Sequence, residues 1–270
     1  ILTWAYLRQC RASSFLDVTR HRIRMRSLGS GPPIRIAFLT DFHFDGPTPM
    51  WFLRRAVDAA MEHRPHIVLI GGDLWTYHIG DGDPAYRALS GLSAPLGIYA
   101  VPGNHDIYVG RERQAEVIRA IGGEMLVNEG VTIGTHLGEV YLAGADDPWR
   151  GEPDLARAMA DRPRGVPSLL LAHQARTILG PCPDPPHLCL SGHTHGGQIC
   201  WPTGRPVWFY DRHLLDHGRG WARVGRTWVY VSRGVGGAFM PLRLNCRPEV
   251  AVFELEGPEG ESEVLARHGQ

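Results

Sequence analysis

A set of polar side chains able to bind metal or move protons follows short apolar runs of the sequence. Its members are Asp41, His43, Asp73, Asn104, His105, Asp106, His173, His193 and His195. Carboxylate, amide and imidazole groups in combination suit borderline to hard divalent metals such as Mn, Fe, Zn or Co. The donors are too numerous for one tetrahedral ion, so the set predicts two ions that share a carboxylate.

The spacing within two of these runs supports a shared metal centre. Asp41 and His43 are two residues apart in DFH, so on an extended segment both side chains point the same way. His193 and His195 have the same spacing in GHTHGG. Glycine allows tight turns and close approach of other groups, so we expect the flanking glycines to let both imidazoles reach the centre.

Apolar runs define the elements that must position these side chains. Strands that run into polar loops are predicted at 34–40, 66–73, 97–106, 140–148, 168–174 and 187–195, further strands at 227–237 and 249–256, and helices at 49–63 and 111–121. In the first helix, Trp51, Leu53, Val57, Ala60 and Met61 have the spacing of a buried face. Strands alternating with helices predict an α/β domain, in which sites form at the carboxyl ends of the strands.

Composition narrows the function classes. The formal net charge of zero gives no reason to expect a nucleic-acid partner. All 28 basic residues are arginines, which excludes lysine chemistry such as a Schiff base. The odd number of cysteines and the lack of a CxxC pair favour free thiols, with Cys182–Cys189 as the alternative disulfide. No G-x-S-x-G run occurs at a strand–helix turn, which argues against an α/β-hydrolase.

Three segments fall outside the regular pattern. Residues 1–30 combine the apolar stub ILTWAYL, arginines and a first strand, in which Arg alternates with Ile23 and Met25. This segment is interpreted either as a solvated edge strand or as a basic patch beside an anionic bilayer, next to the end of a removed signal or anchor. The aromatic residues 201–223 are expected to form a loop or hairpin over the site, and 257–270 a polar tail.

The ordered motifs DFH at 41–43, GD at 72–73, GNHD at 103–106, His173 and GHTH at 192–195 resemble those of the calcineurin-like metallophosphoesterases. The resemblance spans residues 34 to 255 within a predicted domain of residues 31–256. It implies a four-layer α/β/β/α sandwich of two mixed sheets, with two metals at their carboxyl edge. By position, Asp41, His43 and His195 would hold the first ion and Asn104, His173 and His193 the second, with Asp73 bridging. Mn is the first choice of metal.

The resemblance also implies a reaction. A hydroxide held between the two metals would attack the phosphorus of a phosphodiester or pyrophosphate in line. His105 is the candidate proton donor to the leaving group, and Asp106 is expected to hold its tautomer. No serine or cysteine nucleophile is required.

A narrower similarity concerns the substrate. GHTHGGQI, followed by SRGVGG and PLRLNCRPE, is similar to bacterial membrane-associated or exported phosphoesterases that include a UDP-2,3-diacylglucosamine pyrophosphatase. The residues expected to contact substrate are Arg233 and Arg243 for phosphate and Trp75, Trp201 and Trp208 for the remainder. Leu74 and Trp75 depart from relatives that have an acid shortly after the bridging aspartate.

These features favour a lipid-linked phosphate as substrate and a membrane-associated protein that contacts the bilayer through its N-terminal segment. The alternatives are a soluble nucleotide phosphodiesterase or phosphomonoesterase, cytoplasmic or exported, and a non-catalytic metal-binding scaffold. The scaffold is disfavoured because every ligand position of the motif set is filled.

Overall fold

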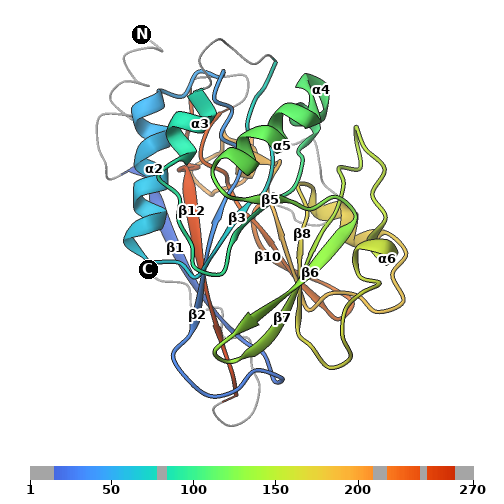
Figure 1. Ribbon diagram of the computed structural model, residues 1–270. Coiled ribbons are helices and arrows are strands. Elements are labelled where there is room, and N and C mark those ends of the chain that lie inside the picture. Colours follow the sequence, from blue (N-terminus) through green and yellow to red (C-terminus); the bar gives the residue numbers. More distant parts are fainter. Residues whose placement is uncertain (1–14, 78–83, 209–217, 238–241, 259–270) are drawn as a thin grey trace.

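Two six-stranded sheets face each other in the computed structural model, which describes residues 15–77, 84–208, 218–237 and 242–258 (Figure 1). The first sheet has the order β1 (Asp17–Arg24), β12 (Glu249–Glu256), β2 (Ile34–Leu39), β3 (Ile67–Ile70), β4 (Ile98–Ala100) and β5 (Glu124–Met125). The second has the order β10 (Gly220–Val224), β11 (Thr227–Val231), β9 (Leu188–Ser191), β8 (Ser168–Leu171), β7 (Gly138–Gly144) and β6 (Glu129–Thr135). Each sheet mixes parallel and antiparallel pairs.

Strand alternation explains why the sheets stack. In β2, Ile36 and Phe38 pack into the core between the sheets, whereas Ala37 and Leu39 belong to the core under the helices. Successive side chains of a strand point to opposite faces, so a strand that is apolar throughout needs cover on both. The continuous apolar runs of the sequence therefore build the central layers of the molecule.

The helices form two unequal outer layers. The first sheet is covered by α2 (Met50–Glu62), α3 (Pro84–Leu89) and α5 (Arg111–Ala120), while α4 (Asn104–Val109) follows β4 (Figure 1). The second sheet is covered by short elements: α6 (Leu155–Ala158) and the 3₁₀ helix η2 (Ala175–Leu179). A further 3₁₀ turn, η3 (His195–Gly197), follows β9. The predicted four-layer sandwich is confirmed, with a thin fourth layer.

The predicted helices and strands are present, but some of their bounds and buried residues differ from the prediction. The helix at 49–63 is present, but Trp51 is 51% exposed, and Phe52 takes the buried place instead. The strands stop earlier than predicted because the polar residues that follow them form turns. Of the aromatic segment, residues 201–208 form a loop and 220–223 belong to β10, which makes a hairpin with β11; residues 209–217 lie outside the described residues.

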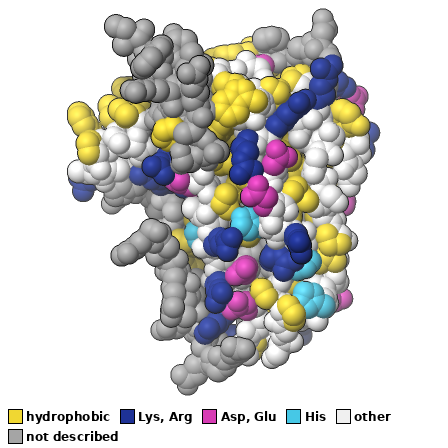
Figure 2. Space-filling model, turned by 90° about the vertical axis from the view of Figure 1, so that its left-hand side faces the viewer, with side chains coloured by type: hydrophobic (Ala, Val, Ile, Leu, Met, Phe, Trp, Pro, Cys, Tyr) yellow, Lys and Arg dark blue, Asp and Glu magenta, His cyan; other side chains and the backbone are white. Residues whose placement is uncertain are grey.

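The first strand, β1, is an edge strand. This agrees with the interpretation of the N-terminal segment as a solvated edge strand. Among the described strands β1 pairs with β12 alone, in parallel, so it forms the edge of the first sheet. Arg22 lies 3.3 Å from Glu254 and 3.8 Å from Glu256, and basic and acidic side chains are interspersed on the face shown in Figure 2. Residues 1–14, which include Arg8 and Arg11, and residues 259–270, which make up most of the predicted polar tail, lie outside the described residues.

The described cysteines, Cys182, Cys189, Cys200 and Cys246, are free thiols, as predicted. Among the described helices, none has the length and apolar character needed to cross a bilayer.

Candidate metal centre

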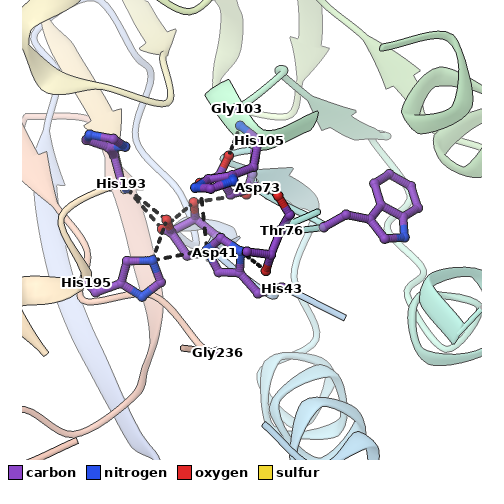
Figure 3. Close-up of polar contacts among 12 residues, drawn as sticks. Asp41, His43, Asp73, Thr76, Gly103, His105, His193, His195 and Gly236 are labelled. Atoms are coloured by element: carbon purple, nitrogen blue, oxygen red, sulfur yellow. Dashed lines mark hydrogen bonds and ion pairs between the residues drawn. The ribbon is translucent and has the colours of Figure 1, made fainter. Parts of the chain in front are cut away.

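The loops at the carboxyl ends of β2, β3, β8 and β9 bring their polar side chains together (Figure 3). Two groups form, each with donor atoms within 4.8 Å of one another: Asp41, His43 and His195, and Asp73, His173 and His193. In Figure 3 the side chains of Asp41, Asp73, His43 and His195 converge, and the backbone N–H of His193 donates to Asp41. The structure thus gathers six of the seven predicted ligands into two adjacent three-donor clusters.

Asp73 lies between the two groups. Its Oδ2 is 3.2 Å from His173 Nε2 of its own group and 3.7 Å from His43 Nε2 of the other. In the first group, His43 Nε2 and His195 Nε2 are 3.1 Å apart, and His195 Nε2 is 3.4 Å from Asp41 Oδ1. One carboxylate within reach of both clusters is the arrangement that a bridging ligand requires.

The backbone at these ligands is turned into an unusual conformation. Positive φ angles occur at Asp41 (57°), His43 (49°), Asp73 (54°), His193 (70°) and His195 (51°). This region is costly for residues with a side chain, and such strain clusters at functional sites. Here it aims consecutive polar side chains inward from the tight loops that end the strands.

Glycines make room for two of the carboxylates. A Cβ atom on Gly103 would lie 2.1 Å from Asp73 Oδ1, and one on Gly192 would lie 2.3 Å from Asp41 Oδ2. Gly196 and Gly197 adopt φ angles of 59° and 83°, which turn the chain after His195. The glycines around the histidines therefore supply both the close approach and the turns expected of them.

Burial keeps three of the histidines neutral. It lowers the pKa of His43 to about 4 and that of His193 to about 3, and it lowers the pKa of His195 well below its usual value. A neutral imidazole has the lone pair that a metal needs. These three rings are accordingly ready to act as ligands at neutral pH.

The remaining ionisable ligands influence one another's charge. Burial acts to lower the pKa of His173, but attraction to Asp73 outweighs it and raises that pKa to about 10. Burial acts to raise the pKa of Asp73, and attraction to His173 and His43 lowers it below the usual range. Burial raises the pKa of Asp41 to about 6, because it disfavours the carboxylate. The proton that Asp73 holds on His173 supplies the positive charge between the carboxylates, and a metal ion bound by His173 would displace that proton.

Neighbouring groups orient the ligand rings. His43 Nδ1 is 2.9 Å from Thr76 Oγ1, and His173 Nδ1 donates to the Gly71 carbonyl at 2.8 Å, so both rings turn Nε2 toward the cluster. Contacts of this kind fix ring orientation in metal sites. Thr76 was not singled out from the sequence, where nothing distinguishes it from other threonines.

Asn104 is the seventh predicted ligand. Its Oδ1 is buried and has no hydrogen-bond partner among the described residues. An orphaned buried acceptor costs free energy unless something occupies it. Asn104 begins α4 directly after β4. An amide oxygen that lacks a partner fits the role of metal ligand, so the mixed nitrogen and oxygen donors suit two divalent cations.

The expected partnership of His105 and Asp106 is corrected. His105 Nδ1 donates to the Thr76 carbonyl at 2.8 Å, so the backbone rather than Asp106 sets its tautomer. Asp106 instead accepts from the backbone N–H groups of Gly103, Asp73 and Leu74 at 2.7–2.9 Å. It ties the loop after β3 to the start of α4 and is a positioning residue. The His105 ring lies 5.4 Å from the His43 ring, beside the cluster.

Three predicted substrate contacts are also corrected. Arg233 pairs with Asp17 at 2.8 Å and Glu249 at 3.2 Å, and Arg243 is buried and donates to backbone carbonyls of the loop at 234–236 and of His195. Trp75 is fully buried in the core under the helices. None of the three presents itself to a substrate.

Trp201 and Trp208 are 59% and 66% exposed on the loop at 201–208, and their contact with a substrate stays a prediction.

The loop after β7 contributes residues that the sequence analysis passed over. Trp149 lies edge-on to His193, with ring centroids 5.0 Å apart, and Arg176 lies over the Trp149 ring at 5.6 Å. Asp147 holds this loop, accepting from the backbone N–H of Trp149 at 2.8 Å and from Gln174 Nε2 at 2.8 Å. The sequence does contain a signal for this loop, because the apolar run at 140–148 ends in polar residues, Asp146 and Asp147, as the other predicted strands do.

Comparison with known proteins agrees with this geometry. Residues 34–197 match the family model of calcineurin-like phosphoesterases, and the chain belongs to this family. It is therefore a metal-dependent phosphoester hydrolase built on the calcineurin-like fold.

Two relatives in sequence and one solved structure illustrate what the chain is similar to. The chain is 32% identical over 263 residues to phosphodiesterase YaeI of Escherichia coli K12, covering 93% of this chain and 92% of that protein. It is 31% identical over 239 residues to a transmembrane protein with metallophosphoesterase domain of Danio rerio, covering 83% of this chain and 53% of that protein. The NAD nucleotidase of Haemophilus influenzae shares the fold, with a TM-score of 0.50 at 12% identity, covering 75% of this chain and 45% of that one.

Proposed function

We propose that the protein hydrolyses a phosphodiester or pyrophosphate bond of a lipid-linked substrate such as UDP-2,3-diacylglucosamine, using two divalent metal ions, with Mn as first choice. The observation that carries the proposal is the pair of donor clusters joined by Asp73. Two bound ions supply an activated water and neutralise phosphate oxygens.

The chain's own residues have distinct roles in this reaction. Asp41, His43 and His195 would hold one ion and Asn104, His173 and His193 the other, with Asp73 between them. His105 stands beside the cluster with Nδ1 bonded to a carbonyl, so its Nε2 is the atom that would carry a proton to the leaving group. Asp106 and Thr76 keep the loops and rings in place.

Two features support a lipid-linked substrate and a membrane surface. Trp201 and Trp208 are exposed together on one loop, where an acyl chain or a bilayer could cover them. The sequence before the first strand combines apolar residues with arginines, a pattern typical of segments that contact anionic lipid. The name of the Danio rerio relative is consistent with a membrane setting.

A soluble phosphodiester is the alternative substrate class. The Escherichia coli relative is named a phosphodiesterase and covers nearly the whole chain. Arginine and glutamate side chains are interspersed near β1, and such a mixed surface is as compatible with water as with lipid headgroups (Figure 2). This alternative keeps the same metal chemistry and changes only the group attached to the phosphate.

Hydrolysis assays with the purified protein distinguish a lipid-linked substrate from a soluble phosphodiester. UDP-2,3-diacylglucosamine in detergent is compared with bis(p-nitrophenyl) phosphate, each with Mn added and with a chelator. Metal-dependent turnover that strongly favours the lipid substrate is the expected result. Metal-dependent turnover of the aryl diester alone would overturn the lipid assignment, and no turnover of either would count against the hydrolase.

A further inference from the structure

Two segments of the chain, residues 198–208 and 242–246, pair to form a small platform beside the metal centre. Ile199 forms a bridge with Leu244, and the backbone N–H of Cys200 donates to the Leu244 carbonyl at 2.8 Å. Within the first segment, backbone hydrogen bonds of 2.8–2.9 Å fold the chain back on itself. The exposed loop with the two tryptophans is therefore part of a hydrogen-bonded structure.

Pairing sorts the side chains of the platform into two faces. Cys200 is buried on the inner face, so its neighbours Ile199 and Trp201 point outward, because successive side chains of an extended segment alternate. Leu244 shares the outer face with its bridge partner Ile199, and so does Val207, which bonds to Ile199 from the other side. The outer face of the platform is therefore apolar.

This outer face is also exposed. The structure describes ten large apolar side chains that are exposed, and four of them belong to the platform at 46–66% exposure: Trp201, Val207, Trp208 and Leu244. Single exposed apolar residues are normal on a protein surface, whereas several gathered together mark an interaction site.

The platform carries positive charge. The sequence has no Asp or Glu from 185 to 210 or from 242 to 248. Arg205 is exposed on the loop of the two tryptophans, and Arg219 donates to two backbone carbonyls at 2.9 Å. A carbonyl accepts a hydrogen bond without cancelling the charge of the guanidinium. An apolar surface with basic side chains is thus presented to any partner, and it favours one that is anionic.

The platform is joined to a metal ligand and to the entry of the first strand. On its inner side, Cys246 Sγ donates to the His195 carbonyl at 3.2 Å. Directly after the second segment, the Pro248 carbonyl accepts from the backbone N–H of Asp17, where β1 begins. The apolar and basic sequence that precedes β1 therefore enters the fold next to the platform, at the edge that holds the metal centre.

We propose that this platform docks the protein on the surface of an anionic lipid bilayer through the outer side chains of Trp201, Val207, Trp208 and Leu244, with Arg205 at the headgroups. This rests on the proposed function, because a lipid-linked substrate requires the metal centre to face the bilayer. Tryptophan is enriched where membranes meet water, and arginine is attracted to anionic headgroups. A stable protein interface uses about 20–30 residues a side, more than this platform offers.

Co-sedimentation of the protein with lipid vesicles tests the docking surface. The vesicles are phosphatidylcholine with or without phosphatidylglycerol and contain no substrate, so binding reports the bilayer itself. We expect binding to the anionic vesicles, and the double change Trp201→Ser and Trp208→Ser should weaken it about tenfold or more. Leu244→Ser should weaken it in the same direction. Arg205→Gln should weaken binding to anionic vesicles about fivefold and leave binding to neutral vesicles unchanged.

The control variants are Leu179→Ser and Arg223→Gln, which should not change vesicle binding. Leu179 is 57% exposed on η2, and Arg223 is exposed on β10, at the end of the second sheet away from the metal centre. No binding to either kind of vesicle would overturn the docking surface. Undiminished binding after the double tryptophan change would also overturn it and would assign the membrane contact to other residues, such as segment 1–14.

Hydrolysis of bis(p-nitrophenyl) phosphate by the wild type, without vesicles, distinguishes failure of the docking surface from failure of the proposed function. If turnover is absent while the tryptophan-dependent binding holds, the proposed function fails and the docking surface stands. If turnover is present while that binding is absent, only the docking surface fails. Metal content is determined for each variant, since Cys246 joins the platform to His195.

Discussion

Two buried polar clusters of this molecule contrast in how their groups are satisfied. Around Glu249, the carboxylate accepts from Thr19 at 2.7 Å and Tyr230 at 2.6 Å and pairs with Arg233 at 3.2 Å, so donors and acceptors match. At the candidate centre, two imidazole nitrogens face each other at 3.1 Å and Asn104 Oδ1 has no partner. The first cluster is complete as it stands, whereas the second is arranged around cations.

The comparison teaches how a metal site differs from a structural network of the same residue types. A structural network neutralises its charges internally and uses ordinary backbone. The candidate centre places like groups together on backbone with positive φ, a costly arrangement that bound cations would stabilise. Substitutions at the candidate metal centre should therefore reduce metal content and turnover. Substitutions in the Glu249 cluster should reduce the free energy of unfolding.

Replacing the residue between the two groups should have the largest effect. Asp73→Ala removes the carboxylate that lies 3.2 Å from His173 and 3.7 Å from His43, so we expect both ions and all turnover to be lost. Metal per chain is measured by inductively coupled plasma mass spectrometry, with the exposed Asp58 of α2 changed to Ala as control. Two ions per chain in Asp73→Ala would refute the bridging role.

The next effect concerns the proton donor. His105→Ala should retain metal and lose turnover by about 10²- to 10⁴-fold, most strongly for leaving groups of high pKa. The measurement is kcat for an alkyl ester and a p-nitrophenyl ester at fixed Mn. Full activity toward the alkyl ester would show that His105 does not supply the proton.

The Glu249 cluster should respond in stability alone. Burial acts to raise the pKa of Glu249, but Arg233 outweighs it and lowers that pKa from 4.5 to about 2. The unfolded chain therefore binds more protons here, and about 3 kcal/mol of stability, present above pH 4.5, is lost as pH falls toward 2. Denaturant unfolding of the wild type and Glu249→Gln between pH 3 and about 6 checks this.

The matched control for that prediction is Glu254→Gln, in an exposed pair with Arg22. Surface pairs contribute roughly 0.2–1 kcal/mol, so this change should barely move the unfolding curve. Metal content of Glu249→Gln should equal that of the wild type. A stability curve with the same pH slope in wild type and Glu249→Gln would contradict the assignment.

The smallest effect is expected at an orienting contact. Thr76→Val removes the hydroxyl beside His43 Nδ1 and should weaken metal binding by about 10- to 100-fold. Thr76→Ser, which keeps the hydroxyl, is the control. Metal titration of the two variants measures the difference, and equal affinities would show that the contact does not tune the ligand.

Continuous apolar runs that end in polar residues predicted the α/β class, and the resemblance to calcineurin-like metallophosphoesterases implied the four-layer sandwich. Sequence reasoning placed the ligand histidines and aspartates at one edge because strand ends share that edge. It failed for Arg233, Arg243 and Trp75 because residue type alone does not reveal partners. An arginine suited to phosphate is equally suited to a buried carboxylate or a loop carbonyl.

Trp149 and Arg176 were missed for a related reason. They lie 27 positions apart in sequence, and the contact between their side chains depends on how the loop after β7 folds against η2. Asp147 sets that fold through hydrogen bonds to the backbone and to Gln174. Such contacts leave no periodic signal, so they become visible only in three dimensions.

The pairing of β1 with β12 has a consequence for how the chain is made. Bonds such as Arg22–Glu254 join residues 232 positions apart, and β12 lies between β1 and β2 in the first sheet. During synthesis the first sheet stays split until β12 leaves the ribosome. The loop just before that strand supplies Gly234, which packs against Asp41. Insertion of β12 thus makes the first sheet continuous, and a chain stopped short of β12 would leave β1 apart from β2.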